Sequence, residues 1–237
     1  MCIKIIFLDI DGVLNSRQSS YLYQGMLGHT ENEWVSYRQG LNSKEYGAYT
    51  EELCPISCSN LKVLLDLHPD ARIVISSTWR RGRVPKWFNI LFQNFKIFEK
   101  DIVIGTTPSF NTERGFEIKH WLDHTEYQVK DFVIIDDDGD MGPYKNTSNF
   151  VQTNNKVGFD YLAMEKVDKL FGGFNLHYKD LKPNTPYKMY SKPREINYLK
   201  GDKGMYYIDD EGKEHTGIFM YEESELFSDA SNFEGCI

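Results

Sequence analysis

The chain has 237 residues, of which 41% are hydrophobic and 14% aromatic, and this composition argues against a disordered chain. Its length predicts one domain of ordinary size with an appendage rather than two full domains. The formal net charge of −8 argues against strong non-specific binding to nucleic acid, because proteins that bind in that way are normally basic.

No early segment has the features of a secretory signal. The only apolar run near the start, residues 3–8, is short and contains Lys4. No later stretch approaches the roughly 20 apolar residues that span a membrane. Cys54 and Cys58 lack a second pair that would complete a zinc site. We therefore expect a cytoplasmic protein without membrane contact.

Short apolar segments with the composition of buried strands alternate with amphipathic segments. The strands are expected at residues 3–9, 71–77, 101–105, 131–136 and 149–153. The helices are expected after Ser59, from Pro85, from Asn111 or Thr112, and over residues 160–171. This order predicts an α/β fold, in which a Rossmann-like parallel sheet of about five strands carries helices on both faces.

Two segments do not follow this alternation. Residues 13–57 are polar and aromatic, and we expect them to form a small cap-like insertion, because a long loop inside a compact domain usually serves a site. Beyond residue 173, tyrosine-rich segments alternate with turn signals, and residues 205–221 (MYYIDDEGKEHTGIFMY) are expected to form a hairpin. The predicted boundaries are 1–171 for the core and 174–237 for a β-rich appendage.

Polar side chains stand where three of the predicted strands end. Asp9 and Asp11 follow the first strand, Ser76 and Ser77 end the second, and residues 136–138 are three aspartates at the end of the fourth. The carboxyl ends of parallel strands share one edge of the sheet, where ligands bind. Crowded carboxylates repel each other unless a cation lies between them, and their oxygens suit Mg²⁺. The sequence therefore predicts a magnesium site among these aspartates.

A magnesium site beside a free carboxylate indicates phosphoryl chemistry. One aspartate can attack phosphorus, and a second acid can protonate the leaving oxygen and later deprotonate water. A hydroxyl and a cation are also needed to stabilise the charge on the transferring group. Ser76 or Ser77 would supply the hydroxyl. Arg114 would supply the cation, with Lys119 as the alternative.

Four segments of the chain resemble the motifs of the haloacid dehalogenase superfamily of phosphatases. They are DIDGV (9–13), IVISS (73–77), Arg114 within TERGFEIKHWL, and VIIDDD (133–138). The stretches DGVLN, SSTWR, R-x-x-E-I-x-x-W-L and IIDDD are similar to the phosphatase domains associated with RNA repair proteins, which are relatives of polynucleotide 3′-phosphatases. The resemblance covers about residues 1–171. No G-x4-G-K-[ST] kinase loop accompanies it.

The resemblance implies a role for each aspartate. Asp9 matches the nucleophile, and Asp11 matches the general acid and base, which also offers its backbone carbonyl to the metal. Asp136 matches the magnesium carboxylate, with Asp137 either as a second ligand or just outside the ligand sphere, and the run of three aspartates leaves this register open by one residue. The magnesium ligands are therefore expected among Asp9, Asp11, Asp136 and Asp137.

Other side chains near the same edge are candidates for holding the substrate. Ser76 is preferred over its neighbour for the hydroxyl role, because it directly follows the apolar triplet. Asn15 follows the first motif and can orient ligand or backbone, and Arg80 belongs to a basic cluster that can hold a second phosphate. Lys119 is a further candidate. Trp79 is expected in the core rather than stacked on a base.

The sequence thus predicts a magnesium-dependent phosphomonoesterase that acts through an aspartyl-phosphate. The favoured substrate is a 3′-phosphate on an RNA or DNA end, or a nucleotide. One alternative is a small-metabolite or phosphoprotein phosphatase of the same fold. Another is a non-catalytic binding protein that keeps the scaffold and uses the appendage to contact a partner. The oligomeric state and the role of residues 174–237 are not predicted.

Overall fold

The computed structural model describes residues 2–19, 53–94, 97–98, 100–173, 183, 185–189, 197–201, 204–218 and 227–229. The chain divides into two compact units, Met1–Val167 and Asp168–Cys236, with Ile237 grouped with the first. The division falls within helix α6 (Tyr161–Leu170). Each unit is described separately below.

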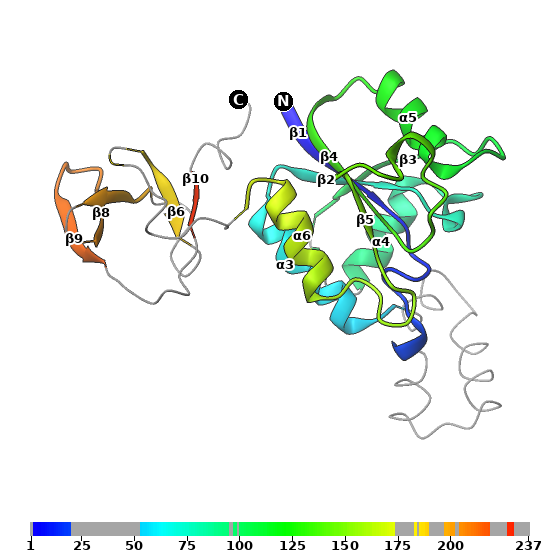
Figure 1. Cartoon of the computed structure of the whole chain (residues 1–237), viewed down its shortest axis with the longest axis horizontal. Coiled ribbons are helices and arrows are strands. Elements are labelled where there is room, and N and C mark those ends of the chain that lie inside the picture. The colour runs from blue at the N-terminus through cyan, green and yellow to red at the C-terminus, as the bar shows by residue number, and fades with distance from the viewer. Residues whose placement is uncertain are drawn as a thin grey trace. The chain divides into compact units, whose positions relative to one another are not determined.

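The first unit is built on a five-stranded sheet, shown in Figure 1. Its strands are β1 (Cys2–Leu8), β2 (Ala71–Ile75), β3 (Val103–Thr106), β4 (Gln128–Asp136) and β5 (Phe150–Gln152). Their order is β3-β2-β1-β4-β5, and all neighbours pair in parallel. The predicted parallel sheet of five strands is confirmed.

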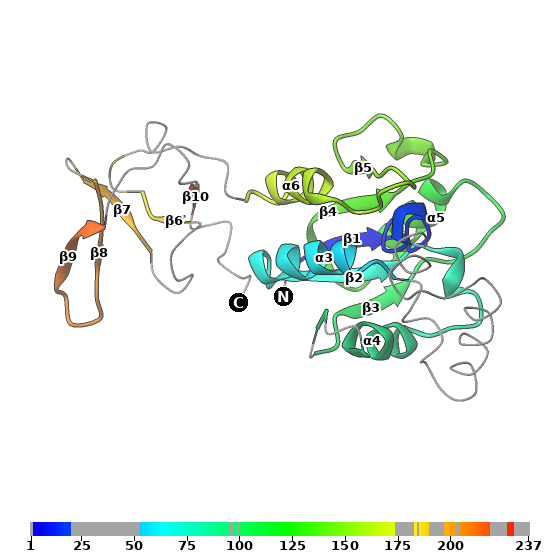
Figure 2. The same cartoon turned by 90° about the horizontal axis from the view of Figure 1, so that it is seen from below.

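Helices cover both faces of this sheet. Figures 1 and 2 show α3 (Pro55–Leu67), α4 (Pro85–Asn94) and α6 on one side and α5 (Arg114–His124) on the other. The side chains of β1 alternate between the two faces, so Ile3, Ile5 and Phe7 pack with Ile118 of α5. None of the helices in the described ranges combines the length and apolar character that crossing a bilayer requires.

Two element boundaries differ from those expected. Helix α3 begins at Pro55 rather than after Ser59, because Cys54 is its N-cap and proline fits the first turn of a helix. Strand β4 begins at Gln128, three residues before Asp131, and its first residues are more exposed than its buried end. The expected insertion falls largely on residues 20–52, which lie outside the described residues.

The second unit contains two small antiparallel sheets. One has three strands, β7 (Leu199–Gly201), β8 (Gly204–Ile208) and β9 (Glu214–Ile218). The other pairs β6 (Tyr187–Met189) with β10 (Phe227–Asp229). The appendage is therefore β-rich, as predicted.

The expected hairpin of the appendage is formed by β8 and β9. The Asp209 side chain organises its turn by accepting hydrogen bonds from the backbone N–H groups of Glu211 and Lys213, and it pairs with His215 at 2.7 Å. Gly212 has a φ of 78°, a left-handed conformation that glycine adopts without strain. Residues 219–221 of the expected hairpin lie outside the described residues.

The order of the strands creates a switch point in the first unit. The chain runs from β1 to β2 and β3 on one side, and then crosses to β4 and β5 on the other. The connections that leave β1 and β4 therefore run toward opposite edges of the sheet, and ligands of doubly wound folds bind at the carboxyl ends of strands at such a point. The first and fourth predicted motifs follow these two adjacent strands.

Candidate active site

Two buried aspartates are neighbours at the switch point. Leu8 of β1 lies beside Ile135 of β4, and the Asp9 N–H donates to the Ile135 carbonyl over 3.0 Å. Asp9 is therefore next to Asp136, and their exposed fractions are 5% and 1%. Carboxylate oxygens of Asp9, Asp136 and Asp137 all lie within 4.8 Å of one another. The structure thus brings three of the expected metal-binding aspartates together.

Arg114 brings a positive charge to this pair. Its Nη1 lies 2.8 Å from Asp9 Oδ1 and 2.9 Å from Asp136 Oδ2. Arg114 is the first residue of α5, and Gly115 allows this end of the helix to approach the loop after β4. A Cβ at Gly115 would collide with the Met141 carbonyl oxygen. Close backbone packing therefore determines where the arginine enters the site.

Burial and like charge together raise the pKa values of the carboxyl groups. Burial is the main cause for Asp136, whose pKa is raised to about 8, and the charge of Asp9 adds to it while Arg114 opposes it. Burial also raises the pKa of Asp9, although Arg114 and a hydrogen bond from Ser77 act to lower it. Burial raises the pKa of Asp137 as well. One guanidinium does not neutralise three carboxylates. The donor set therefore fits Mg²⁺, a divalent ion that prefers oxygen ligands.

Asp11 occupies a different environment on the turn after β1. It is exposed, and within the described residues its carboxylate is not part of the group that could share a metal ion. Asn15 Nδ2 donates to its Oδ1 over 2.8 Å, and Trp79 Nε1 donates to its Oδ2 over 2.9 Å. Gly12 has a φ of 75°, and a Cβ there would collide with the Asp137 carboxylate. The turn thus places the two aspartates of the first motif in different environments, with Asp9 buried among carboxylates and Asp11 exposed.

The two serines after β2 also differ. Ser77 hydrogen-bonds Asp9, and its hydroxyl accepts the Trp79 backbone N–H over 3.3 Å. The Ser76 hydroxyl is buried and has no hydrogen-bond partner among the described residues, while the Ser76 carbonyl accepts from Arg114. The sequence favours Ser76 for the hydroxyl role, because it directly follows the apolar triplet. The geometry favours Ser77, because its hydroxyl lies against Asp9.

Arg80, the expected contact for a second phosphate, is buried and bound by protein groups. Its exposed fraction is 8%, and it forms an ion pair with Glu117 at 2.5 Å. Its guanidinium also donates to three backbone carbonyls, those of Ser77, Thr107 and Pro108. Glu117 in turn accepts the Phe110 N–H over 2.7 Å. Arg80 therefore joins the loops after β2 and β3 to helix α5, and its guanidinium already donates to four protein oxygens.

Lys119 is also remote from the carboxylates. It is exposed on α5 and pairs with Asp123 at 2.7 Å, so the structure brings Arg114 rather than Lys119 to Asp9. Two contacts of the site were not anticipated from the sequence, the ion pair of Glu117 and the hydrogen bond from Trp79 to Asp11. Local spacing gives no signal for the first, because Glu117 pairs with Arg80, which lies 37 positions away in the sequence.

Replacing Glu117 by glutamine is expected to lower the free energy of unfolding by about 3 kcal/mol, because a buried arginine then lacks its counter-charge. Glutamine keeps an oxygen for the Phe110 N–H. Urea unfolding followed by circular dichroism measures the change. In the matched control, Lys119→Gln breaks an exposed pair on the same helix and should lower the free energy of unfolding far less. Equal losses in both variants would contradict a buried, structural pair.

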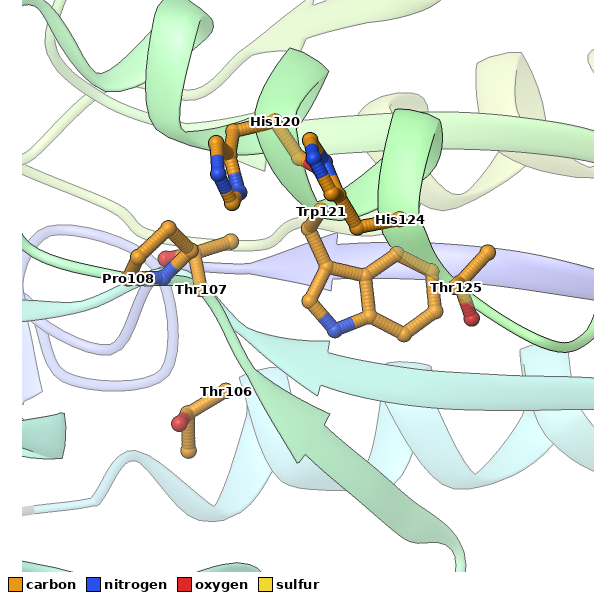
Figure 3. A pocket seen from close by; sticks show the side chains of 7 residues that line it. All are labelled: Thr106, Thr107, Pro108, His120, Trp121, His124 and Thr125. Carbon is orange, nitrogen blue, oxygen red and sulfur yellow. The ribbon is translucent and has the colours of Figure 1, made fainter.

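A separate pocket lies between the end of β3 and α5, as Figure 3 shows. Its lining residues are Thr106, Thr107, Pro108, His120, Trp121, His124 and Thr125. The rings of His120 and His124 stack with centroids 4.0 Å apart, as neighbours one turn apart on a helix can. The pocket contains none of the expected site residues, so the chemistry is assigned to the switch point instead.

Residues 5–162 match the family described as the HAD domain in Swiss Army Knife RNA repair proteins. The solved HAD domain of the effector protein Lem4 from Legionella pneumophila is 17% identical over 71% of this chain and 93% of that chain, with a TM-score of 0.39. A haloacid dehalogenase-like hydrolase of Streptococcus pneumoniae is 14% identical over 69% of this chain and 90% of that chain, with a TM-score of 0.34. The comparison with curated proteins gave no match. The matched family segment contains every site residue described above.

Proposed function

Because the chain belongs to the family of haloacid dehalogenase (HAD) domains of Swiss Army Knife RNA repair proteins, we propose that it is a phosphomonoesterase acting through an aspartyl-phosphate. The observation that carries the proposal is the contact of one arginine with both Asp9 and Asp136 at the switch point. A nucleophilic carboxylate must be fixed and desolvated, and it needs a cation nearby to accept the charge of the phosphoryl group. Asp9 meets these conditions.

The proposed reaction has two steps on the residues of this chain. Asp9 attacks phosphorus, the bond from phosphorus to the leaving oxygen breaks, and that oxygen takes the electron pair and a proton from Asp11. A water molecule then attacks the phosphorus of the aspartyl-phosphate and gives a proton to Asp11. The bond from phosphorus to Asp9 breaks, so inorganic phosphate leaves and both side chains are restored.

Arg114 and Ser77 would bind and orient the phosphoryl group during both steps. The Arg114 guanidinium contacts Oδ1 of Asp9, the proposed nucleophile, and the Ser77 hydroxyl forms a hydrogen bond with the same side chain. Charge on a transferring phosphoryl group spreads over its equatorial oxygens, so fixed donors on both sides stabilise it. The donors are held in place by the packing of α5 and by the turn after β2.

Asp9, Asp136 and Asp137 would hold a magnesium ion, with the backbone carbonyl of Asp11 as a further oxygen. The convergence of three carboxylate oxygens and the raised pKa of Asp136 support this assignment. When bound, the ion supplies positive charge that stabilises phosphoryl oxygens. Asp137 is the least buried of the three carboxylates, and a Cβ on Gly12 would occupy its position.

The proposed substrate is a phosphate at a nucleic-acid end, preferably a 3′-phosphate, or a nucleotide. The family description, which names RNA repair proteins, supports this class. The net charge of −8 makes broad electrostatic binding of a duplex unfavourable, so recognition would be confined to the end itself. A small metabolite or a phosphoprotein is the alternative substrate of the same chemistry.

A panel of substrates tests the proposal. It comprises 3′- and 5′-phosphorylated RNA and DNA oligonucleotides, 3′-mononucleotides, phosphopeptides and p-nitrophenyl phosphate, each with Mg²⁺. The highest kcat/KM is expected for the 3′-phosphorylated oligonucleotides. A preference for phosphopeptides would contradict the proposed substrate class and leave the proposed mechanism in place. Absence of turnover on every member would favour the non-catalytic binding protein.

A further inference from the structure

We propose that Trp79 is a positioning residue that sets the orientation of the Asp11 carboxylate and thereby promotes protonation of the leaving group. The inference rests on the proposed function, in which Asp11 is the general acid. The Trp79 Nε1 lies 2.9 Å from Asp11 Oδ2, a contact between residues 68 positions apart in the sequence. It ties the turn after β1 to the turn after β2.

Two donors from different segments hold the Asp11 carboxylate. Trp79 donates to Oδ2, and Asn15 donates to Oδ1. The amide of Asn15 is itself fixed, because its oxygen accepts the Gly12 N–H over 2.9 Å. The indole N–H of Trp79 can only donate a hydrogen bond, so Asp11 can act only as the acceptor in this contact. With both oxygens engaged, the plane of an exposed carboxylate is defined, although it would otherwise rotate freely.

Trp79 is positioned by the same turn that carries Ser77. It belongs to the short 3-10 helix Thr78–Arg80, and its backbone N–H donates to the Ser77 hydroxyl. The Arg83 guanidinium lies 5.7 Å from the centroid of the Trp79 ring and 4.4 Å from that of Trp87, and Arg83 Nη1 donates to the Trp79 carbonyl over 2.8 Å. These contacts constrain the indole, so its N–H points in a defined direction.

Proton donation by Asp11 matters more for some substrates than for others. A ribose hydroxyl is a poor leaving group and requires a proton as its bond to phosphorus breaks. The p-nitrophenolate ion is stable in water and leaves without one. A residue that acts through Asp11 must therefore affect the first kind of substrate selectively. A residue that only stabilises the fold would affect both kinds equally.

The test is the Trp79→Phe variant, which removes the N–H and keeps an aromatic ring. Its kcat on a 3′-phosphorylated oligonucleotide is expected to fall about tenfold, while kcat on p-nitrophenyl phosphate changes less than about twofold. The ratio of the two values, measured on one sample, does not depend on the folded fraction. Equal losses on both substrates would overturn the proposal. If this variant does not fold, Asn15→Ala removes the other donor and is tested in the same way.

Two further variants separate a role through Asp11 from other effects. Trp121→Phe alters an indole that packs against Phe7 and has no contact with Trp79 or Asp11 among the described residues, so its substrate ratio should equal that of the wild type. In an Asp11→Asn background, Trp79→Phe should cause no additional loss, because residues that act through one group are not additive. Independent, multiplying losses would show that Trp79 acts elsewhere.

A measurement without turnover distinguishes failure of this inference from failure of the proposed function. The chain has four tryptophans, and the Trp79→Phe variant identifies the Trp79 indole resonance in a ¹H–¹⁵N spectrum. Asp11→Ala is expected to shift that resonance, whereas Asp138→Asn is not. An unchanged resonance in Asp11→Ala would refute the contact even in an active enzyme. A shifted resonance in a protein without phosphatase activity would support the contact between Trp79 and Asp11 and contradict the proposed function.

Discussion

The Asp9→Asn variant is expected to lose phosphatase activity by about 10³-fold or more, because an amide oxygen does not replace the carboxylate that bonds to phosphorus. The loss should appear on p-nitrophenyl phosphate as well as on 3′-phosphorylated oligonucleotides. A nucleophile is needed for every leaving group. This distinguishes Asp9 from Asp11 and Trp79, whose removal should affect the poor leaving groups more.

Stability measurements must show that Asp9→Asn remains folded. Burial raises the pKa of Asp9, because removal from water costs free energy for the charged form. Asparagine is uncharged and nearly the same shape, and it leaves Arg114 to Asp136. Without metal, the variant should therefore unfold at a temperature no lower than that of the wild type. A large loss of activity in an equally stable protein assigns the effect to chemistry.

A direct assay of the covalent intermediate completes this prediction. Wild-type protein quenched with acid during turnover of a ³²P-labelled phosphate ester should carry label on the peptide containing Asp9, and the variant should carry none. Full activity of Asp9→Asn would remove the residue from the mechanism. Label on a peptide that lacks residues 7–14 would assign the nucleophile to another segment.

The core of the first unit could be predicted from the sequence because its signals are local and strong. Residues 3–8 and 133–135 are nearly continuous apolar runs, as expected for strands covered on both faces. Their parallel pairing then places the polar residues that follow them side by side. This reasoning places Asp9 beside the run 136–138, and the structure groups Asp9 with Asp136 and Asp137.

The surroundings of the site depend on contacts between distant segments and were harder to infer. The phosphate-binding role expected for Arg80 took no account of Glu117, a residue of α5 whose carboxylate pairs with the Arg80 guanidinium inside the protein. The choice between Ser76 and Ser77 depends on which hydroxyl faces the β1 end after the strand finishes at Ile75. A run of two serines does not encode that direction. The bond from Trp79 to Asp11 likewise depends on tertiary packing.

Removal of magnesium is expected to abolish activity. The three carboxylates of Asp9, Asp136 and Asp137 carry up to three negative charges, of which Arg114 offsets one. A phosphate ester adds further negative charge, so its approach is unfavourable until a divalent ion is bound. Activity should disappear in EDTA and return with added Mg²⁺. Full activity in the presence of the chelator would remove the metal from the mechanism.

A matched pair of variants tests whether magnesium binds to the carboxylates of Asp9, Asp136 and Asp137. Asp137→Asn should raise the Mg²⁺ concentration for half-maximal activity about tenfold or more, because one charged ligand is lost. Asp138→Asn should leave it unchanged, because that exposed side chain is outside the group. The shift of the unfolding temperature with Mg²⁺ should follow the same order, since an ion that binds only the folded state stabilises it. Equal behaviour of the two variants would place the ion away from Asp137.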